Sequence, residues 1–174
     1  KKRKQMAIHN IERCLKVSTD KAEQIAKKSW TRFGPMIMEV LRFKVICKNI
    51  NKYVTIKGEE NIKKAMSYGN GGVIATAHSG NWEIIGAALT HKGMKIAGVA
   101  QHQRNEGVNN FINYCRAFTG MHITDKLDIK EMMKMLGQKY FIGLIMDQDG
   151  GSTGIIMPFL GYEASCVQGP AVMS

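Results

Sequence analysis

A histidine and an acidic residue lie five positions apart in the segment His78-Ser79-Gly80-Asn81-Trp82-Glu83. If the whole segment were helical, the two side chains would lie about 140° apart, because an α-helix has 3.6 residues per turn. They can meet only across a bend from a strand into a helix. Gly80 permits such a bend, and Asn81 can cap the helix that follows.

A bend of this kind would allow general-base catalysis by His78. Glu83, in the first helical turn, could point back and accept a hydrogen bond from one imidazole nitrogen, which would fix the tautomer of the ring. The other nitrogen would then take a proton from an attacking hydroxyl. The structural alternative is a histidine that only hydrogen-bonds near a helix start, with Glu83 favoured there by the helix dipole.

The elements that position these residues alternate between strand and helix from residue 53 onward. The patterns predict strands over Tyr53–Gly58, Val73–Ala77, Lys95–Ala100 and Phe141–Met146. They predict helices over Glu59–Tyr68, Asn81–Thr90, Val108–Thr119 and Lys130–Gln138. This alternation indicates an α/β fold with a mainly parallel sheet flanked by helices. His78 and Asp147 each follow a predicted buried strand, at the end where ligands collect in such sheets.

The first 52 residues are expected to form a basic helical segment. Apolar residues recur at helical spacing through residues 1–16, and Ser18-Thr19-Asp20 can cap a second helix that runs from about residue 21 towards Phe33. Gly34-Pro35 should interrupt or kink this helix before residues 36–47 continue it. We divide the chain into this segment and an α/β core over residues 53–174. We expect a fragment of a longer protein, because the sequence lacks an initiator Met and stops at the start of a new apolar element.

The net charge of +11 is concentrated in the N-terminal third of the chain. Residues 1–52 carry 14 Lys and Arg against 4 Asp and Glu, whereas residues 53–174 carry 11 against 10. Clustered cations attract anionic phospholipid headgroups, nucleic acid or an acidic protein, and charge alone does not choose among them. A solvated charged face on ordinary packing helices is the simpler interpretation.

Other chemistry receives little support from the sequence. The four cysteines and the remaining histidines lack metal-ligand spacing, so we expect no metal site and a reducing compartment. The glycine-rich turns at residues 69–72 and 150–152 lack the Lys-Ser/Thr of a P-loop and the dinucleotide fingerprint. Nucleotide cofactors are therefore not expected, and we expect no cofactor of another kind.

Several motifs together resemble the late acyltransferases of lipid A biosynthesis, the lauroyl and myristoyl transferases. Residues 77–83 resemble that family's His-x4-Asp/Glu motif, and Arg116 within residues 114–120 resembles its arginine-plus-glycine block. Residues 146–151, 158–161 and 168–171 resemble its Asp-Gln block and the blocks that follow, in the same order. Ser79 and Leu160 depart from the family pattern, which often has Phe at both places.

The resemblance implies a glycerolipid-acyltransferase-like fold and transfer of a fatty acyl group from acyl-carrier protein to a hydroxyl of a lipid A precursor. The reaction would occur at the cytoplasmic face of the bacterial inner membrane, with the basic segment on anionic headgroups or on the carrier protein. His78 and Glu83 would be catalytic. The residues expected to bind substrate are Arg116 and Arg104, for a phosphate or an oxyanion, together with Asp147, Gln148 and Asn81.

Two alternatives stay open at this point. An acyltransferase of the same superfamily could act on another glycolipid or on a lysophospholipid with unchanged chemistry. A basic module without enzymatic activity could instead bind a membrane or nucleic acid, with the His-Glu pair incidental. Sparse aromatic residues and the absence of a recognisable nucleic-acid module argue against a nucleic-acid partner.

Overall fold

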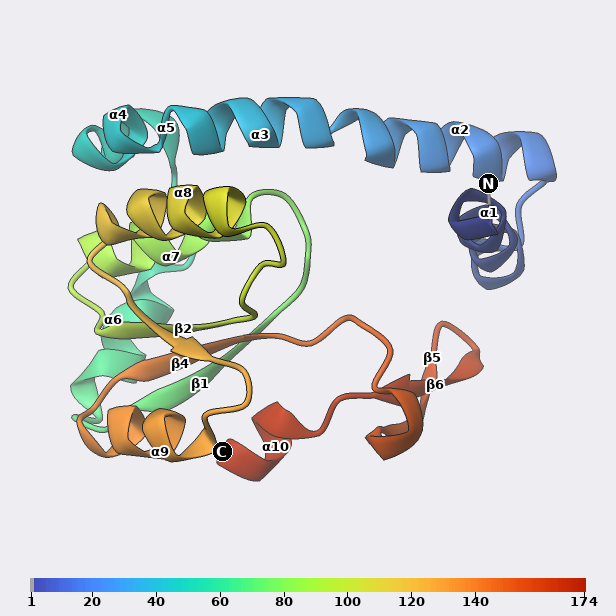
Figure 1. Cartoon of the computed structure of the whole chain (residues 1–174). Coiled ribbons are helices and arrows are strands. Elements are labelled where there is room, and N and C mark those ends of the chain that lie inside the picture. The colour runs from blue at the N-terminus through green and yellow to red at the C-terminus, as the bar shows by residue number, and fades with distance from the viewer. Residues whose placement is uncertain (1) are drawn as a thin grey trace.

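A four-stranded parallel sheet forms the centre of the protein, described here over residues 2–174 by a computed structural model (Figure 1). Its strands are β1 (Gly72–Thr76), β2 (Ile96–Ala100), β3 (His122–Asp125) and β4 (Phe141–Ile145), in the order β1-β4-β2-β3. In register, Phe141 lies opposite both Gly72 and Ile96. Because the strands are parallel, their carboxyl ends meet at one edge. The predicted α/β fold with a parallel sheet is confirmed.

Helices cover both faces of this sheet (Figure 1). The helices of this part of the chain are α6 (Glu59–Ser67), α7 (Trp82–His91), α8 (Glu106–Ala117), α9 (Ile129–Gly137) and α10 (Gly169–Met173). On one face, Ile96 and Phe141 are buried against side chains of α6 and α7. On the other, Ala97 and Ile142 are buried against Met135 of α9. The two faces together enclose β4 and β2 at the middle of the body.

The first third of the chain is helical, as predicted. It contains α1 (Lys2–Leu15), α2 (Thr19–Thr31), α3 (Phe33–Leu41), α4 (Phe43–Lys48) and α5 (Ile50–Tyr53). Ser18 caps α2, because its Oγ accepts a hydrogen bond from the backbone N–H of Lys21 at 3.4 Å. Figure 1 shows α2 and α3 as a nearly straight rod along one side of the body, with α1 folded back beneath its free end.

This rod is anchored to the body through its C-terminal end. Phe43, Ile46 and Ile50 are buried in one cluster with Ala87, Ala88 and Cys115 of α7 and α8. The predicted boundary after residue 52 falls inside α5, and both α4 and α5 share a core with the α/β body. The division into two domains stays a prediction.

The predicted break in the second helix is displaced by a few residues. It falls at Arg32, and Gly34 and Pro35 lie inside the first turn of α3. Proline is tolerated there, because its missing N–H would have no acceptor within the helix. A second interruption at Arg42 separates α3 from α4 within the stretch that was predicted to be continuous.

The predicted strand over Tyr53–Gly58 is wrong. Tyr53 ends α5, and no strand is formed between residues 54 and 58. Val54 and Ile56 pack against the cluster around Phe43, so their alternation reflects burial on one side rather than pairing in a sheet.

The structure also contains strands that were not predicted. These are β3 and an antiparallel hairpin of β5 (Ile155–Phe159) and β6 (Tyr162–Cys166), which follows the short 3₁₀ helix η1 (Gly151–Thr153). The hairpin contacts α1: the Tyr162 hydroxyl donates to the carbonyl oxygen of Arg13 at 3.1 Å, and the Arg13 guanidinium lies 4.5 Å from the Tyr162 ring centroid. The hairpin near the C-terminal end of the sequence thus lies against α1 (Figure 1). Across residues 2–174, none of the helices has the length and apolar character needed to span a bilayer.

Replacing Ile142 with Ala should destabilise the fold strongly, because this side chain is fully buried in the central strand. We expect the free energy of unfolding to fall by about 2–5 kcal/mol in urea denaturation. Leu127→Ala is the control, since Leu127 is 81% exposed and its loss should change stability by about 0.5 kcal/mol at most. Similar losses in the two variants would contradict the assigned core.

Candidate active site

His78 and Asp147 meet at the carboxyl edge of the sheet. His78 follows β1 and Asp147 follows β4, and these two strands are neighbours whose last residues, Thr76 and Ile145, are paired in register. The backbone N–H of His78 donates to Asp147 Oδ2 at 2.9 Å, and His78 Nδ1 lies 2.7 Å from Asp147 Oδ1. Both carboxylate oxygens of Asp147 therefore contact His78, one at its backbone and one at its ring.

The charge of Asp147 fixes which ring nitrogen of His78 carries a proton. Partial burial raises the pKa of Asp147, but hydrogen bonds from the His78 side chain and backbone outweigh this effect and keep it below the usual value. An ionised carboxylate only accepts hydrogen bonds, so Nδ1 must donate. Within residues 2–174, Nε2 makes no hydrogen bond, and the His78 side chain is 33% exposed. Nε2 is therefore free to take a proton from a hydroxyl.

The predicted bend after His78 is confirmed. Gly80 has a φ of +65°, which side chains other than glycine rarely adopt, and Asn81 caps α7 by accepting from the backbone N–H of Ile84 at 3.4 Å. The bend brings the Trp82 ring edge-on to the His78 ring, with centroids 4.8 Å apart. Asp147 and Trp82 together fix the orientation of the imidazole.

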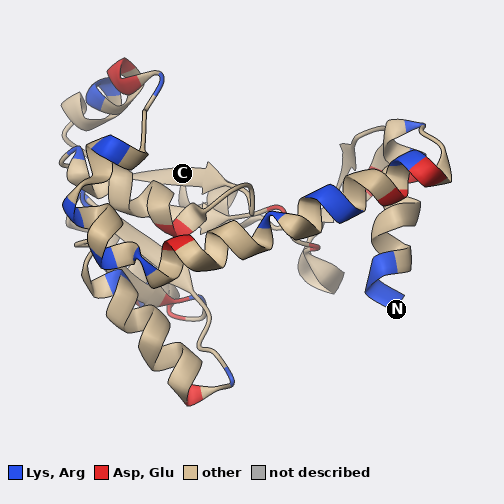
Figure 2. Ribbon diagram, turned by 90° about the horizontal axis from the view of Figure 1, so that it is seen from above, with Lys and Arg blue, Asp and Glu red and all other residues tan. Residues whose placement is uncertain are grey.

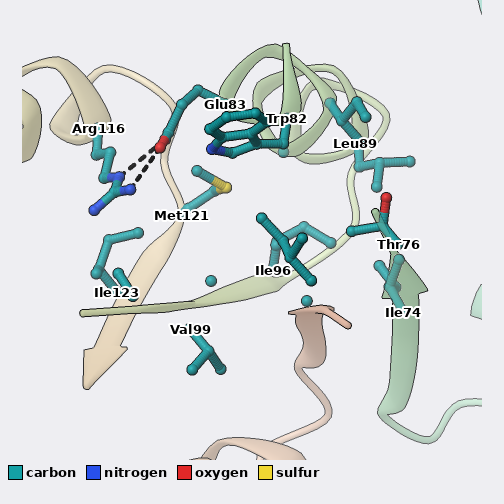
Figure 3. A pocket seen from close by; sticks show the side chains of 16 residues that line it. Ile74, Thr76, Trp82, Glu83, Leu89, Ile96, Val99, Arg116, Met121 and Ile123 are labelled. Carbon is teal, nitrogen blue, oxygen red and sulfur yellow. Dashed lines mark hydrogen bonds and ion pairs between the residues drawn. The ribbon is translucent and has the colours of Figure 1, made fainter. Parts of the chain in front are cut away.

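Glu83 does not bond His78, contrary to our prediction. Its carboxylate accepts two hydrogen bonds from Arg116 of α8, from Nε at 2.9 Å and from Nη2 at 2.5 Å (Figure 3). The two side chains are only 15% and 18% exposed. The first turn of α7 directs Glu83 towards α8, where the planar guanidinium fork matches a carboxylate better than an imidazole does.

Arg116 and Asp147 have protein partners that were not predicted. Glu83 engages Nε and Nη2 of Arg116, and Asp147 holds His78. The sequence analysis missed the partnership of Asp147 with His78, although both residues follow an apolar strand. The roles of Arg116 and Asp147 in binding substrate stay predictions.

The other predicted substrate-binding residues lie near the same edge of the sheet. Asn81 Nδ2 donates to Glu39 Oε2 at 2.9 Å, which ties the start of α7 to α3. Gln148 follows Asp147, and Arg104 lies in the loop between β2 and α8; both are exposed, and neither side chain is bonded to another part of the described chain. Their roles in binding substrate stay predictions.

Two apolar cavities adjoin the site. The smaller, with a volume of about 100 Å³, lies between α7 and the sheet and contains Ile96 and Met121 in its lining (Figure 3). The larger, about 460 Å³, is a groove between α3, α7 and α8. Trp82, Glu83 and Arg116 line both cavities, so the indole and the ion pair form the wall between them. The groove has the volume and apolar lining typical of a small-ligand site.

Other candidates for the chemistry are weaker. Cys115 lines the groove, but burial raises the pKa of its thiol and the nearby Glu83 charge adds to the rise, so the thiol stays protonated and a poor nucleophile. His122 begins β3, at the opposite edge of the sheet, and pairs with Glu131 at 3.2 Å, whereas His102, in the loop after β2, lies 3.7 Å from Glu106. In the portion of the chain that the structure describes, no three His, Cys, Asp or Glu residues gather as metal ligands would.

Comparison with known proteins shows similarity to acyltransferases. A family model described as bacterial lipid A biosynthesis acyltransferase matches residues 1–174. Phosphatidylinositol mannoside acyltransferase from Mycobacterium tuberculosis, in strains CDC 1551 / Oshkosh and ATCC 25618 / H37Rv, is 26% identical over 125 residues. The match covers 68% of this chain and 39% of the mycobacterial protein, so the chain corresponds to well under half of these relatives.

Breaking the Glu83–Arg116 pair should destabilise the fold even without substrate. We expect Glu83→Gln and Arg116→Met each to lower the free energy of unfolding by about 1–3 kcal/mol, because each leaves a mostly buried partner unsatisfied. In a double-mutant cycle, the combined loss should fall short of the sum of the single losses by about 1 kcal/mol or more.

Lys4→Gln is the control for this cycle. It breaks the pair between Lys4 and Glu23, whose side chains are 68% and 53% exposed, and it should change stability by less than about 0.5 kcal/mol. Strictly additive losses in the Glu83 and Arg116 variants would show that the two residues are not coupled.

Proposed function

The chain belongs to the bacterial lipid A biosynthesis acyltransferase family, and we propose that it transfers a fatty acyl group to a hydroxyl of a lipid acceptor with His78 as general base. The observation that carries this proposal is the pair of contacts between His78 and Asp147, which leaves Nε2 of the ring unshared. Asp147 takes the orienting role that the sequence analysis gave to Glu83.

The proposed reaction requires one base that later acts as an acid. His78 Nε2 takes the proton of the acceptor hydroxyl while its oxygen attacks the carbonyl carbon of an acyl thioester. Asp147 stays ionised and stabilises the imidazolium that forms. As the tetrahedral intermediate collapses, the carbon–sulfur bond breaks and the imidazolium returns the proton to the leaving thiolate. The products are an acyl ester and a free thiol.

The groove between α3 and α8 is suited to the hydrocarbon part of the substrate. Most of its lining is apolar, and its wall includes Trp82, whose ring contacts His78. A chain held in this groove would keep its carbonyl end near the base, and this positioning would lower the entropic cost of the reaction. Glu83 and Arg116 would then act as part of the pocket rather than as the proton-transfer pair.

The finer assignments are also part of the proposal. We place acyl-carrier protein as the donor, a lipid A precursor as the acceptor, and the cytoplasmic face of the bacterial inner membrane as the location. The family membership and the basic N-terminal third support these choices, since both an acidic carrier and anionic headgroups attract cations. Arg104 and Gln148, which are exposed along this edge, are the residues that we place in contact with the acceptor.

A glycolipid acceptor of another kind is the second candidate. It is favoured by the similarity to phosphatidylinositol mannoside acyltransferase, whose name specifies a mannoside acceptor. The proton transfer would be unchanged, and only the contacts around the acceptor would differ. A basic module without catalysis would leave the His78–Asp147 arrangement without a role.

His78→Ala and Asp147→Asn should each lower acyl transfer by this protein by about 10²- to 10⁴-fold. Transfer of a labelled acyl group from acyl-carrier protein is measured with a lipid A precursor and, separately, with a phosphatidylinositol mannoside. Asp128→Asn is the matched control, because Asp128 caps α9 away from the site and Asn caps equally well. The control should retain full activity.

Circular dichroism and urea denaturation establish that each variant is folded. Undiminished transfer by folded His78→Ala protein would rule out the general base. Transfer to the mannoside alone would select the second acceptor and leave the mechanism standing.

A further inference from the structure

The outer face of α3 is apolar and lacks a protein partner within the described chain. Its nine residues include none that is buried, and Ile37, Met38 and Leu41 are 53%, 57% and 58% exposed. Its only ionisable residue, Glu39, bonds inward to Asn81. A helix on a water-facing surface normally presents polar residues outward. The composition of α3 is that of a surface that contacts an apolar phase.

Aromatic and cationic side chains bracket this apolar face. Trp30 is 75% exposed, and its ring lies 5.6 Å from that of Phe33. Arg32 and Arg42 stand at the two ends of α3, and both are exposed. Additional exposed lysines flank the helix at positions Lys27, Lys28, Lys44 and Lys48. Figure 2 shows the blue segments along α2 and the mostly tan stretch over α3.

This combination distinguishes a bilayer from the other polyanions that the charge would attract. Tryptophan and cations around an apolar helix are typical of helices that lie in the membrane interface, with aromatic rings at headgroup level. Nucleic acid or an acidic protein would satisfy the cations but would leave the apolar face of α3 in water. The pattern therefore favours anionic phospholipid.

The same face is continuous with the groove next to the site. Ile37 and Leu41 line the groove while remaining more than half exposed. Opposite them, Val108 and Phe111 of α8 also line it and are 47% and 40% exposed. The mouth of the groove is thus rimmed by apolar side chains. Apolar side chains of α3 and α8 and the Trp82 ring line the same groove.

We propose that α3 lies in the interface of an anionic phospholipid bilayer, with Trp30, Phe33, Ile37 and Leu41 inserted, so that the groove opens directly into the membrane. These four positions follow a spacing of three and four residues and share one side of the rod. The proposed docking is inferred from the exposed residues of this face and does not depend on the catalytic mechanism. The passage of a lipid chain into the groove rests on the proposed function.

Tryptophan fluorescence tests the docking without any measurement of activity. The chain has two tryptophans, so the variant Trp82→Phe leaves Trp30 as the only reporter. Vesicles of phosphatidylcholine and phosphatidylglycerol should shift the Trp30 emission to the blue, and brominated phospholipids in the same mixture should quench it. The proposal would be overturned if the protein sedimented with the vesicles while the Trp30 emission stayed unshifted and was still quenched by aqueous iodide.

Matched substitutions show whether α3 provides the affinity for the vesicles. Phe33→Asp should weaken sedimentation with these vesicles by about tenfold or more, because it replaces an apolar side chain inserted in the bilayer by a charge. Leu127→Asp is the control: Leu127 is 81% exposed on another part of the surface and should leave binding unchanged. Equal loss in both variants would contradict docking through α3.

A second set of variants tests the charge contribution without changing the apolar face. Arg32→Gln combined with Arg42→Gln should weaken binding to the anionic vesicles, by about fivefold for each lost charge, and should leave the weak binding to pure phosphatidylcholine unchanged. Equal binding of wild-type protein to anionic and neutral vesicles would overturn the choice of lipid. Vesicle binding that persists in His78→Ala protein would separate this docking from the catalytic proposal.

Discussion

The contact between His78 and Asp147 is the interaction on which the proposed function depends. This contact forms because β1 and β4 are adjacent parallel strands whose last residues, Thr76 and Ile145, are paired. The residues that follow the two strands therefore lie at the same edge of the sheet. The buried centre around Ile142 holds β4 in place, and Gly80 turns the chain away at once so that His78 stays at the strand end. A histidine supported by an ionised carboxylate on one nitrogen leaves the other nitrogen free to move a proton.

The pair formed by Glu83 and Arg116 has a different physical character. Two mostly buried charges are stable only when their hydrogen bonds are well satisfied, and the bidentate geometry provides this. The position of the pair, between a small cavity under α7 and the larger groove under α3, makes it part of the shape of the site. Glu83, the acid nearest to His78 in the sequence, thus pairs with Arg116, and Asp147, an acid distant in the sequence, holds the His78 ring.

Local patterns were sufficient to predict much of this arrangement. Hydrophobic periodicity identified β1, β2 and β4 and the helices between them, and cap chemistry identified Ser18 and Asn81. The predictions were wrong where burial or strand pairing depends on residues that are distant in the sequence. The alternation through Val54 and Ile56 is the same for a strand and for an extended segment packed on helices. Likewise, the order of strands decides whether Asp147 or Glu83 reaches His78, and that order depends on contacts between residues far apart in the sequence.

The most direct test of this account is the protonation of the His78 ring itself, followed by long-range ¹H–¹⁵N correlation spectra of protein with ¹⁵N-labelled histidine. We predict that neutral His78 carries its proton on Nδ1, that Asp147→Asn changes the His78 nitrogen shifts, and that Glu83→Gln leaves these shifts nearly unchanged. A proton on Nε2, or His78 nitrogen shifts that respond to Glu83→Gln and not to Asp147→Asn, would contradict this assignment.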